Sequence, residues 1–304
     1  MTSLHINTPL IEAPGMSQSS GSKVWLKMEA LQPSGSFKNR GVGFACQAHQ
    51  ARGAKALVSS SGGNAGLAVA YSGRQLGMPV TVVVPESTKQ RAIDLMNQQG
   101  AKVIITGKIW DEAHQHAMTL PNDQTAYIHP FDDPLLWEGH ASIIDEVVEA
   151  GVNPDAVVLS VGGGGLLCGV IEGLKRNGLN NTPVVAVETQ GAHSLSTAIT
   201  ARQHIGIDNI DSIATSLGAK IVAKQAFELS QEYPISSHVV SDKQAVDACC
   251  RFVDDHRILV EPACGASLAV VYEGCEALKD KRNILVIVCG GVGVSLAQLR
   301  QWRG

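Results

Sequence analysis

The sequence predicts an α/β fold with mostly parallel sheets. Short apolar runs rich in β-branched residues alternate with longer stretches of helical pattern, the order expected of strand–helix–strand units. Two of these runs, Val80–Val84 and Ile284–Cys289, are almost continuously apolar, which is typical of parallel strands covered on both faces. The chain has 304 residues, which at about 150 residues per domain suggests two domains.

Eight strands are expected, each a short apolar run. In chain order they are Lys23–Glu29, Ala56–Ser60, Val80–Val84, Lys102–Thr106, Ala126–His129, Ala156–Val161, Pro183–Glu188 and Ile284–Cys289. Helices are expected between the strands, and the clearest are Leu67–Leu76, Ser87–Gln99, Leu135–Ala150 and Asp242–His256. Because Ser87 follows the strand-closing Pro85, it is predicted to be the N-cap of its helix.

Two clusters of helix- and strand-breaking residues, Gln32–Gly35 and His129–Pro134, divide the chain. They bracket a segment that carries four of the expected strands. We therefore expect a small domain at residues 35–134, inserted into a large cofactor-binding domain made of residues 1–34 and 135–304. Ligands in such folds bind at the carboxyl ends of strands and at helix N-termini, so chemical motifs are sought there.

Composition excludes several classes of protein. The net charge is −4 with scattered cations, which gives no basic surface for nucleic acid or for a membrane. Seven cysteines without a Cys-x-x-Cys pair favour a reducing compartment over a disulfide scaffold or zinc site. No signal peptide is recognisable in Met1–Pro9, and the longest apolar runs are shorter than the ~20 residues of a spanning helix. A cytoplasmic enzyme is the expectation.

The first candidate functional loop is Pro33–Gly41, where small residues precede a helix and Lys38 stands in its first turn. The positive end of the helix dipole favours the neutral amine of such a lysine, and a neutral lysine amine forms Schiff bases. On its own this pattern is more typical of a surface lysine beside an N-cap serine.

The second loop, Ser59–Gly66, follows a strand and opens the helix Leu67–Leu76. Its small residues leave backbone N–H groups exposed at a helix N-terminus, which favours an anion. Because the loop holds no lysine or arginine, a carboxylate fits it better than a triphosphate does. A plain strand-to-helix turn remains the alternative for this loop.

Two further glycine-rich loops each end a strand. The four consecutive glycines Gly162–Gly165, with Leu166, are costly to order, and they suit a backbone that wraps a phosphate. They match neither the Walker pattern nor Gly-x-Gly-x-x-Gly. Cys289, followed by Gly290 and Gly291, can meet a planar ligand edge-on or be simply a buried thiol. Together, the four loops specify pyridoxal 5′-phosphate in an α/β fold.

At this point the sequence resembles the fold-type-II pyridoxal-phosphate enzymes, which are tryptophan synthase β-like, with two open, mostly parallel sheets flanked by helices. Within them it is most similar to the catabolic L-serine/L-threonine dehydratases of the liver type, over essentially the whole chain. The stretches that carry the resemblance are Ser34–Lys38, Ser60–Gly66, Gly162–Leu166, Glu188–Ser194, Val260–Ala266 and Cys289.

The resemblance implies an L-serine ammonia-lyase that forms pyruvate and ammonia and also converts L-threonine to 2-oxobutanoate. It implies that Lys38 binds the cofactor covalently and acts as the base, with Ser61 as a second catalytic residue. The implied cofactor-binding residues are Phe37, Lys38, Asn64, Gly162, Gly163, Gly164, Gly165, Leu166 and Cys289. The implied substrate-binding residues are Ser61, Gly62, Gly63, Asn64 and Ala65.

The resemblance further implies a homodimer and a monovalent cation such as potassium. The positions implied for the cation are Gly162, Glu188, Ala192, Ser194, Leu217 and Ala219. For Glu188 the alternative is a surface carboxylate at a strand end.

Two residues depart from the resemblance. Gly62 stands where the more active dehydratases carry alanine, and Val292-Gly293 stands where Ser-Asn is usual. Because glycine leaves its loop extra freedom, Gly62→Ala is expected to raise turnover of serine. Three alternatives stay open: a serine racemase, a β-replacement enzyme with the same cofactor, and a catalytically dead homologue that only binds amino acids.

Overall fold

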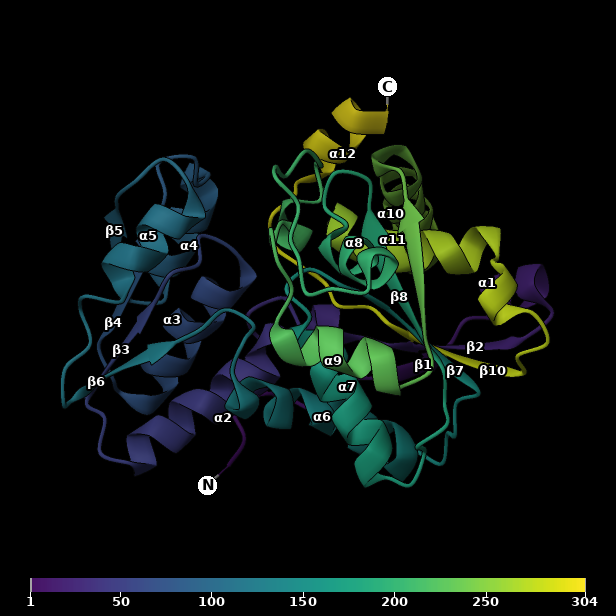
Figure 1. The fold of residues 1–304 in the computed structure, drawn as a ribbon, viewed down its shortest axis with the longest axis horizontal. Helices are drawn as coiled ribbons and strands as arrows, with labels where there is room; N and C mark the ends of the chain where they lie inside the picture. The colour runs from purple at the N-terminus through teal and green to yellow at the C-terminus, as the bar shows by residue number, and fades with distance from the viewer. Residues whose placement is uncertain (1, 304) are drawn as a thin grey trace. The chain divides into compact units, whose positions relative to one another are not determined.

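The computed structural model describes residues 2–303, which form two compact units. The smaller unit consists of residues 2–6 and Gln32–His140, and the larger unit consists of Asn7–Leu31 and the chain from Ala141 onward. In Figure 1 the smaller unit's labels run from α2 to β6, and the sheet of the larger unit is labelled from β1 to β10. Each unit has its own sheet.

The N-terminal segment belongs to the smaller unit because its backbone is hydrogen-bonded there. The Ile6 N–H donates to Gln32 Oε1 at 3.1 Å, and Gln32 Nε2 donates to the Ile6 carbonyl at 2.9 Å. Asn39 Nδ2 donates to the Leu4 carbonyl at 3.2 Å. The sequence-based domain boundaries after residues 34 and 134 stay a prediction.

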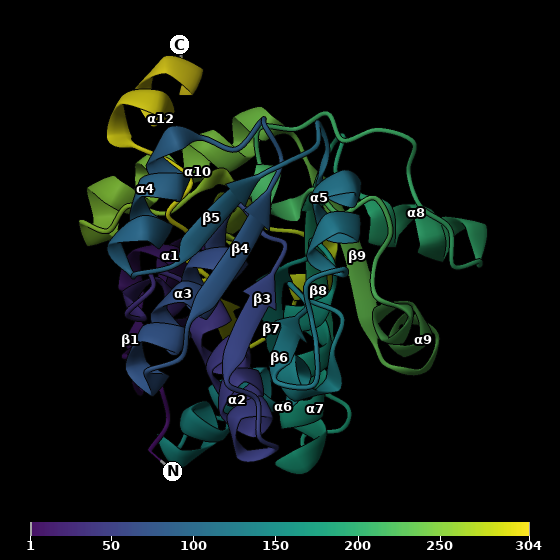
Figure 2. The ribbon, with the colours of Figure 1, turned by 90° about the vertical axis from the view of Figure 1, so that its left-hand side faces the viewer.

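The smaller unit contains a four-stranded parallel sheet in the order β5-β4-β3-β6, and Figure 2 shows β5, β4 and β3 side by side. Its strands are β3 (Ala56–Ser59), β4 (Val80–Val84), β5 (Lys102–Ile105) and β6 (Thr125–Ile128). Its helices are α2 (Lys38–Ala51), α3 (Asn64–Leu76), α4 (Gln90–Gln98) and α5 (Trp110–Ala117), and α6 (Pro134–Glu149) begins in this unit. All four strands predicted here are found, each within two residues of its expected bounds.

The start of α4 differs from the prediction. Its N-cap is Lys89, not Ser87. The reason is a turn between the strand and the helix, in which the Thr88 N–H donates to the Pro85 carbonyl at 3.0 Å. This turn takes up the residues that were expected to form the first turn of the helix.

Helix α5 packs on the sheet of the smaller unit through small residues. Ala113 and Ala117 lie one turn apart and form a buried cluster with Val58 of β3 and Val83 of β4. Short side chains on this face let the helix approach the strands closely. The other end of the helix, at Trp110, then lies near the carboxyl end of β3.

The larger unit contains a six-stranded sheet in the order β1-β2-β10-β7-β8-β9, in which only β1 is antiparallel to its neighbour. Its strands are β1 (Leu10–Glu12), β2 (Lys23–Lys27), β7 (Ala156–Ser160), β8 (Val184–Thr189), β9 (Ile235–Val240) and β10 (Asn283–Ile287). The edge strands β1 and β9 were not predicted from the sequence. The first is three residues long, and the second carries Ser236, Ser237 and His238 in place of an apolar run.

The helices of the larger unit fill the intervals between these strands. They are α1 (Pro14–Ser20), α7 (Gly165–Arg176), α8 (Ser194–Ala201), α9 (Lys224–Glu232), α10 (Asp242–His256), α11 (Pro262–Glu273) and α12 (Leu296–Arg303), with short 3₁₀ helices η1 (Glu29–Leu31), η2 (Thr215–Leu217) and η3 (Glu276–Leu278). Helix α10 matches its predicted bounds, because Ser241 and Gln244 form a capping box at its start. Helix α11 is buried along its whole length except at Glu273.

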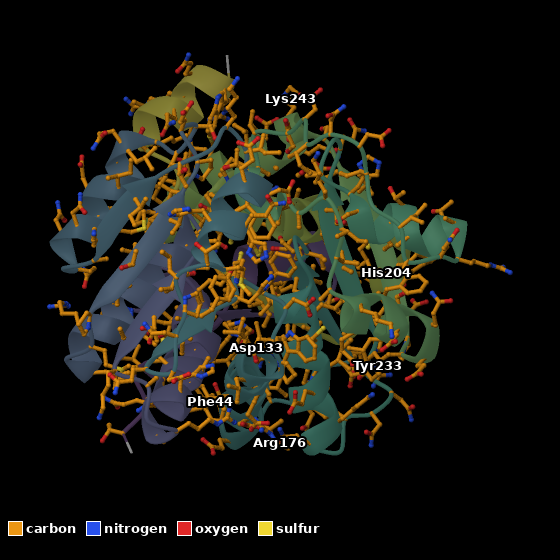
Figure 3. All side chains as sticks on the ribbon, turned by 60° about the vertical axis from the view of Figure 1, so that its left-hand side comes forward. Phe44, Asp133, Arg176, His204, Tyr233 and Lys243 are labelled. Carbon is orange, nitrogen blue, oxygen red and sulfur yellow. The ribbon has the colours of Figure 1, made fainter. Side chains whose placement is uncertain are left out.

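Charged side chains also fix local structure at the surface. Asp133, labelled in Figure 3, precedes α6, and its Oδ1 accepts the Leu135 N–H at 2.8 Å. Arg176, labelled in the same view, ends α7 and forms an ion pair with Asp145. No helix within residues 2–303 combines the length and the apolar character that crossing a bilayer requires.

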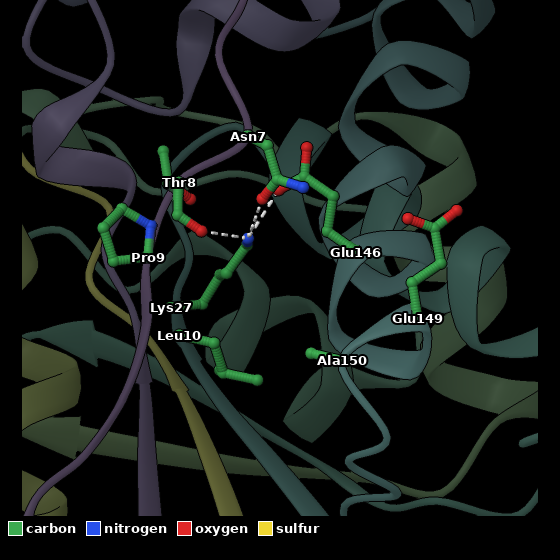
Figure 4. A pocket seen from close by; sticks show the side chains of 8 residues that line it. All are labelled: Asn7, Thr8, Pro9, Leu10, Lys27, Glu146, Glu149 and Ala150. Atoms are coloured by element: carbon green, nitrogen blue, oxygen red, sulfur yellow. Dashed lines mark hydrogen bonds and ion pairs between the residues drawn. The ribbon is translucent and has the colours of Figure 1, made fainter.

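A pocket of about 530 Å³ in the larger unit surrounds a buried ion pair (Figure 4). Lys27 Nζ lies 2.5 Å from Glu146 Oε2 and donates to the Thr8 carbonyl at 2.7 Å. The lysine side chain is only 1% exposed, so the pair is largely desolvated. The lysine and the glutamate satisfy each other's charge and tie β2 to α6, which is a structural role.

Candidate active site

Lys38 is the first residue of α2, directly after the loop of small residues. Its Nζ donates to the Pro130 carbonyl at 2.5 Å and lies 5.0 Å from the centre of the Phe37 ring. The Phe37 ring lies 4.9 Å from that of His140. Burial, followed by the charge of Lys38, lowers the pKa of His140 well below its usual value, so this imidazole is neutral. Lys38 thus stands at a helix start, where a backbone carbonyl holds its amine beside an aromatic ring.

The loop after β3 runs from Ser60 to Gly63 and leads into α3 at Asn64. Ser61 Oγ accepts the Gly63 N–H at 3.4 Å. The Ser61 carbonyl lies so close to Gly66 that a Cβ at that position would collide with it. The predicted substrate-binding residues therefore lie together in one strand-to-helix turn, where the first N–H groups of a helix have no partner within it.

Gly62 packs directly against Thr88. A Cβ at Gly62 would lie 2.5 Å from Thr88 Oγ1 and 2.8 Å from its Cγ2, both too short for van der Waals contact. The backbone of Gly62 does not have a left-handed φ, so the obstacle to a side chain is this neighbour and not the backbone. This packing opposes the gain in turnover expected of Gly62→Ala, because an added methyl displaces either the loop or Thr88.

Three aromatic side chains, those of Trp110, His114 and Tyr127, surround Ser60. We call these four residues the Trp110 cluster. The Trp110 indole Nε1–H donates to the Ser60 carbonyl at 2.5 Å. Ser60 Oγ lies 2.6 Å from Tyr127 Oη and 3.3 Å from His114 Nδ1, and His114 Nδ1 lies 2.8 Å from Tyr127 Oη. Burial raises the pKa of Tyr127 to about 12, so its hydroxyl keeps its proton and can donate it within the cluster.

His129 lies beside the Trp110 cluster, just after the end of β6. Its Nδ1 accepts the N–H groups of Phe131 at 3.2 Å and Asp132 at 2.7 Å. Burial, with the charges of His114 and Lys38, lowers the pKa of His129 to about 4. The imidazole is therefore neutral near pH 7 and carries its hydrogen on Nε2.

The sequence interpretation missed the Trp110 cluster, although a signal was present. Trp110 and His114 are four residues apart in α5, which places them on one face of the helix. Tyr127 and His129 are two residues apart, which places them on one face of the strand. The sequence gives no sign that these two faces meet at Ser60.

The glycine loop of the larger unit connects β7 to α7. Gly164 has a left-handed φ of +88°, and a Cβ there would lie 2.5 Å from the Cβ of Ala226. A Cβ at Gly162 would lie 3.0 Å from the Cα of Leu217. Gly164 is therefore required by both backbone conformation and space, and Gly162 by space. The four glycines and Leu166, predicted to hold phosphate, form this loop and the first turn of α7.

Cys289 follows β10 and is buried against α11. Its thiol shares a hydrogen bond with Cys264, and that bond, together with burial, raises the pKa of Cys289 well above its usual value. The Glu261 carboxylate accepts the Gly293 N–H at 3.1 Å and fills the space beside Gly291. A Cβ at Gly293, where the family motif usually has asparagine, would lie 2.9 Å from Glu261 Oε2.

Glu188 is the last but one residue of β8 and is fully buried, so it is not a surface carboxylate. Its two oxygens accept the N–H groups of Leu195 at 2.9 Å and Ser196 at 2.8 Å, and thereby cap α8. Burial raises the pKa of Glu188 to about 7, although both hydrogen bonds act in the opposite direction.

The other predicted cation positions lie in the same unit. Ala192 and Ser194 are buried, and Ser194 Oγ has no hydrogen-bond partner among the described residues. The Ala219 N–H donates to the Leu217 carbonyl at 2.8 Å, and Gly162 packs on Leu217. Within residues 2–303 no cluster of three histidine, cysteine or acidic side chains could hold a metal ion.

Comparison with known proteins decides the family. The model of the family described as "Pyridoxal-phosphate dependent enzyme" matches residues 1–290. The chain belongs to this family. It is 49% identical to a human L-serine dehydratase/L-threonine deaminase over 308 residues, covering 98% of this chain and 94% of the relative. It is 48% identical to a mouse serine dehydratase-like protein, covering 98% of this chain and 93% of the relative.

Solved structures agree with this assignment. A fungal L-serine ammonia-lyase from Rhizomucor miehei superposes with a TM-score of 0.93 at 38% identity, covering 99% of both chains. The predicted fold class, a fold-type-II enzyme with two mostly parallel sheets flanked by helices, is therefore confirmed.

The residues present fit the cofactor of this family. A phosphate needs N–H donors without side chains in the way, and the loop at Gly162–Gly165 has no side chains and leads into the N-terminus of α7. The hydroxyls of Ser34 and Ser36, in the loop before Lys38, are buried without a partner among the described residues. Buried polar atoms left unsatisfied are typical of a site that a ligand completes.

Proposed function

We propose that this protein is a pyridoxal-phosphate-dependent L-serine ammonia-lyase that forms pyruvate and ammonia, and that it also converts L-threonine to 2-oxobutanoate. The observation that carries the proposal is Lys38, whose amine is held at a helix start by the Pro130 carbonyl beside the Phe37 ring. The 49% identity to a relative named L-serine dehydratase/L-threonine deaminase supports the choice of substrates.

Lys38 would hold the cofactor and then, as the free amine, take the proton from the substrate Cα. When bound, pyridoxal phosphate supplies an electron-withdrawing ring that acidifies this carbon. The loop Ser61–Ala65 would bind the substrate carboxylate through backbone N–H groups, with Asn64 toward the ring. The β-hydroxyl leaves as water, and hydrolysis of the product returns that water, so no oxidant is needed.

Two groups of the larger unit are also proposed to bind the cofactor. The N–H groups at Gly162–Leu166 would hold the phosphate. Cys289 would stand by the ring nitrogen as a protonated thiol, because its pKa is raised by the Cys264 hydrogen bond and by burial. A protonated thiol is a weak partner that leaves the nitrogen largely neutral, which favours loss of the hydroxyl over long-lived carbanions.

Potassium binding, a homodimer and a cytoplasmic location are also proposed. The cation is supported by the buried Glu188 carboxylate and by the unpartnered Ser194 hydroxyl. The dimer is supported by resemblance to the dehydratases. The cytoplasm is supported by seven free cysteines, which is the state expected in a reducing compartment.

The test is a spectrum and an assay on the purified holoenzyme. Added L-serine should change the cofactor absorbance, and pyruvate should accumulate in step with ammonia. A change in absorbance without pyruvate would overturn the proposed reaction and support the amino-acid-binding homologue.

Serine racemase is the second candidate, and one observation favours it. Ser61 Oγ accepts the Gly63 N–H, so its own hydrogen is available to donate to a substrate carbon. A serine racemase from Dictyostelium discoideum superposes with a TM-score of 0.86 at 26% identity. Chromatographic assay of D-serine beside pyruvate separates the two activities.

A further inference from the structure

The peptide bond between Ser60 and Ser61 is held from one side by an indole. Trp110 Nε1–H donates to the Ser60 carbonyl at 2.5 Å. The described residues contain no cis peptide bond. In a trans peptide the C=O of one residue and the N–H of the next point in opposite directions. The side chain that fixes the Ser60 carbonyl therefore also fixes the direction of the Ser61 N–H.

The indole is itself held in place by its neighbours. The Trp110 ring stacks on His114, with 4.8 Å between centroids and 12° between planes. The His129 ring lies edge-on to the indole, with 6.3 Å between centroids and 84° between planes. His114 cannot turn freely, because its Nδ1 is bonded to Tyr127 Oη at 2.8 Å. The Trp110 cluster thus forms a fixed support for one peptide plane.

The other end of Ser61 is restrained by the backbone. Its carbonyl packs against Gly66, where a side chain would not fit, and its Oγ accepts the Gly63 N–H at 3.4 Å. With the carbonyls of Ser60 and Ser61 both restrained, the Ser61 N–H has little freedom to change direction.

We propose that Trp110 is a positioning residue that aims the Ser61 N–H at the carboxylate of the amino-acid substrate. The inference rests on the proposed function, which assigns the carboxylate to the loop Ser61–Ala65. Trp110 acts through the Ser60–Ser61 peptide and not through contact with the reacting atoms. A purely structural role, as an anchor that holds α5 to the sheet, would make no distinction between ligands with and without a carboxylate.

The experiment compares two probes on the holoenzyme. L-alanine carries the amine and carboxylate of serine without a leaving group, and ethanolamine carries the amine and hydroxyl without the carboxylate. Each is titrated while cofactor absorbance is followed. In Trp110→Phe, which keeps an aromatic ring and loses the N–H, the Kd for L-alanine should rise about threefold to tenfold, the range for one lost hydrogen bond. The Kd for ethanolamine should stay within about twofold of the wild type, since only the carboxylate contact is affected.

A second replacement protects the test against a folding defect. Benzothienylalanine placed at position 110 keeps the shape of the indole and lacks only the N–H, so it should reproduce the split between the probes. Trp25→Phe, in β2 of the larger unit, controls for the loss of a tryptophan and should change neither Kd. Equal weakening of both probes, or no change for L-alanine, would overturn the inference.

Failure of the proposed function is distinguishable from failure of the inference. If the wild type forms no pyruvate from L-serine, the reaction is wrong, yet the probe titrations still report on Trp110. If the wild type forms pyruvate and the probes do not split, only the role of Trp110 is wrong. For L-serine turnover, the effect of Trp110→Phe should fall on KM more than on kcat.

Discussion

Two strand–loop–helix turns, one in each unit, are built for anions in different ways. The turn after β7 consists of Val161 and a run of glycines, and neighbours such as Ala226 leave no room for a side chain at Gly164. The turn after β3 has a serine pair whose backbone is held by side chains from elsewhere, above all by Trp110. The first turn depends on its own sequence, whereas the second depends on residues distant in sequence.

The difference indicates how each turn can change. A binding loop made of glycine backbone, like the turn after β7, does not tolerate a side chain within it, but most substitutions outside the loop leave it unchanged. A loop held by neighbouring side chains can be adjusted one contact at a time, which suits a substrate site more than a cofactor site. The predictions below test this contrast.

Removing Lys38 should have the largest effect, because neither turn can replace a base. In Lys38→Ala, pyruvate formation from L-serine should fall by at least about a hundredfold, the usual contribution of a general base. Circular dichroism should show an unchanged fold. Lys55→Ala, at an exposed site in the same unit, should keep full activity. Substantial activity in Lys38→Ala would show that the base is elsewhere.

Gly164→Ala should disrupt the glycine loop Gly162–Gly165, which is proposed to bind the phosphate. A left-handed φ costs a non-glycine residue about 1–2 kcal/mol, and the collision with Ala226 adds to this. Cofactor affinity, measured by absorbance titration of the apoprotein, should fall by at least about tenfold. Gly178→Ala is the matched control, since Gly178 has a φ of +76° with open space around it and lies at the far end of α7. Equal loss of cofactor affinity in both variants would contradict a role of the glycine loop in binding the cofactor.

Gly62→Ala should lower turnover of serine rather than raise it. Overpacking costs about 1–3 kcal/mol, and here the methyl group meets Thr88, so kcat/KM should fall at least about fivefold. Adding Thr88→Ala removes both colliding atoms and should restore most of the loss, while Thr88→Ala alone serves as the reference. A single Gly62→Ala variant faster than the wild type would show that the loop, and not Thr88, absorbs the methyl group.

Glu188 adds a third case to the comparison of the two turns. Here a side chain of the larger unit holds backbone in place, because it accepts the N–H groups of Leu195 and Ser196. Its pKa of about 7 in the fold exceeds the ordinary 4.5, so the folded state keeps the proton longer than the unfolded state. The free energy of unfolding should therefore fall as pH rises from about 4.5 to about 7, by at most about 1.4 kcal/mol per pH unit.

The measurement is urea unfolding across this pH range. Glu188→Gln should lose this part of the slope, whatever its own stability. If potassium binds as proposed, it favours the ionised carboxylate, so potassium should flatten the wild-type slope more than choline at equal ionic strength. Parallel slopes in the wild type and Glu188→Gln would rule out Glu188 as the titrating group.

The sequence alone predicted the features that depend on a single segment of the chain. Val80–Val84 and Asp242–His256 were predicted to the residue, because a continuous apolar run and a helical pattern are local. The glycine loop was recognised for the same reason. Lys38 was found because the small residues just before it indicate the start of a helix.

What the sequence could not provide depends on contacts between segments. Thr88 under Gly62, the Trp110 cluster around Ser60 and Glu261 beside Gly291 all join residues at least 26 positions apart. The edge strand β9 was missed because its Ser236 and Ser237 match no apolar pattern, and pairing with β8 alone makes it a strand.

The strand order of the larger unit bears on how the protein emerges from the ribosome. β10 lies between β2 and β7, so the hairpin of β1 and β2 has no second neighbour until residues 283–287 have been synthesised. The sheet of the smaller unit needs only residues 56–128. Pairings distant in sequence form late, so the smaller unit can fold during translation while the larger unit waits. During that interval the edge of β2 is open, and chaperones that bind exposed strands would act on this part of the nascent chain.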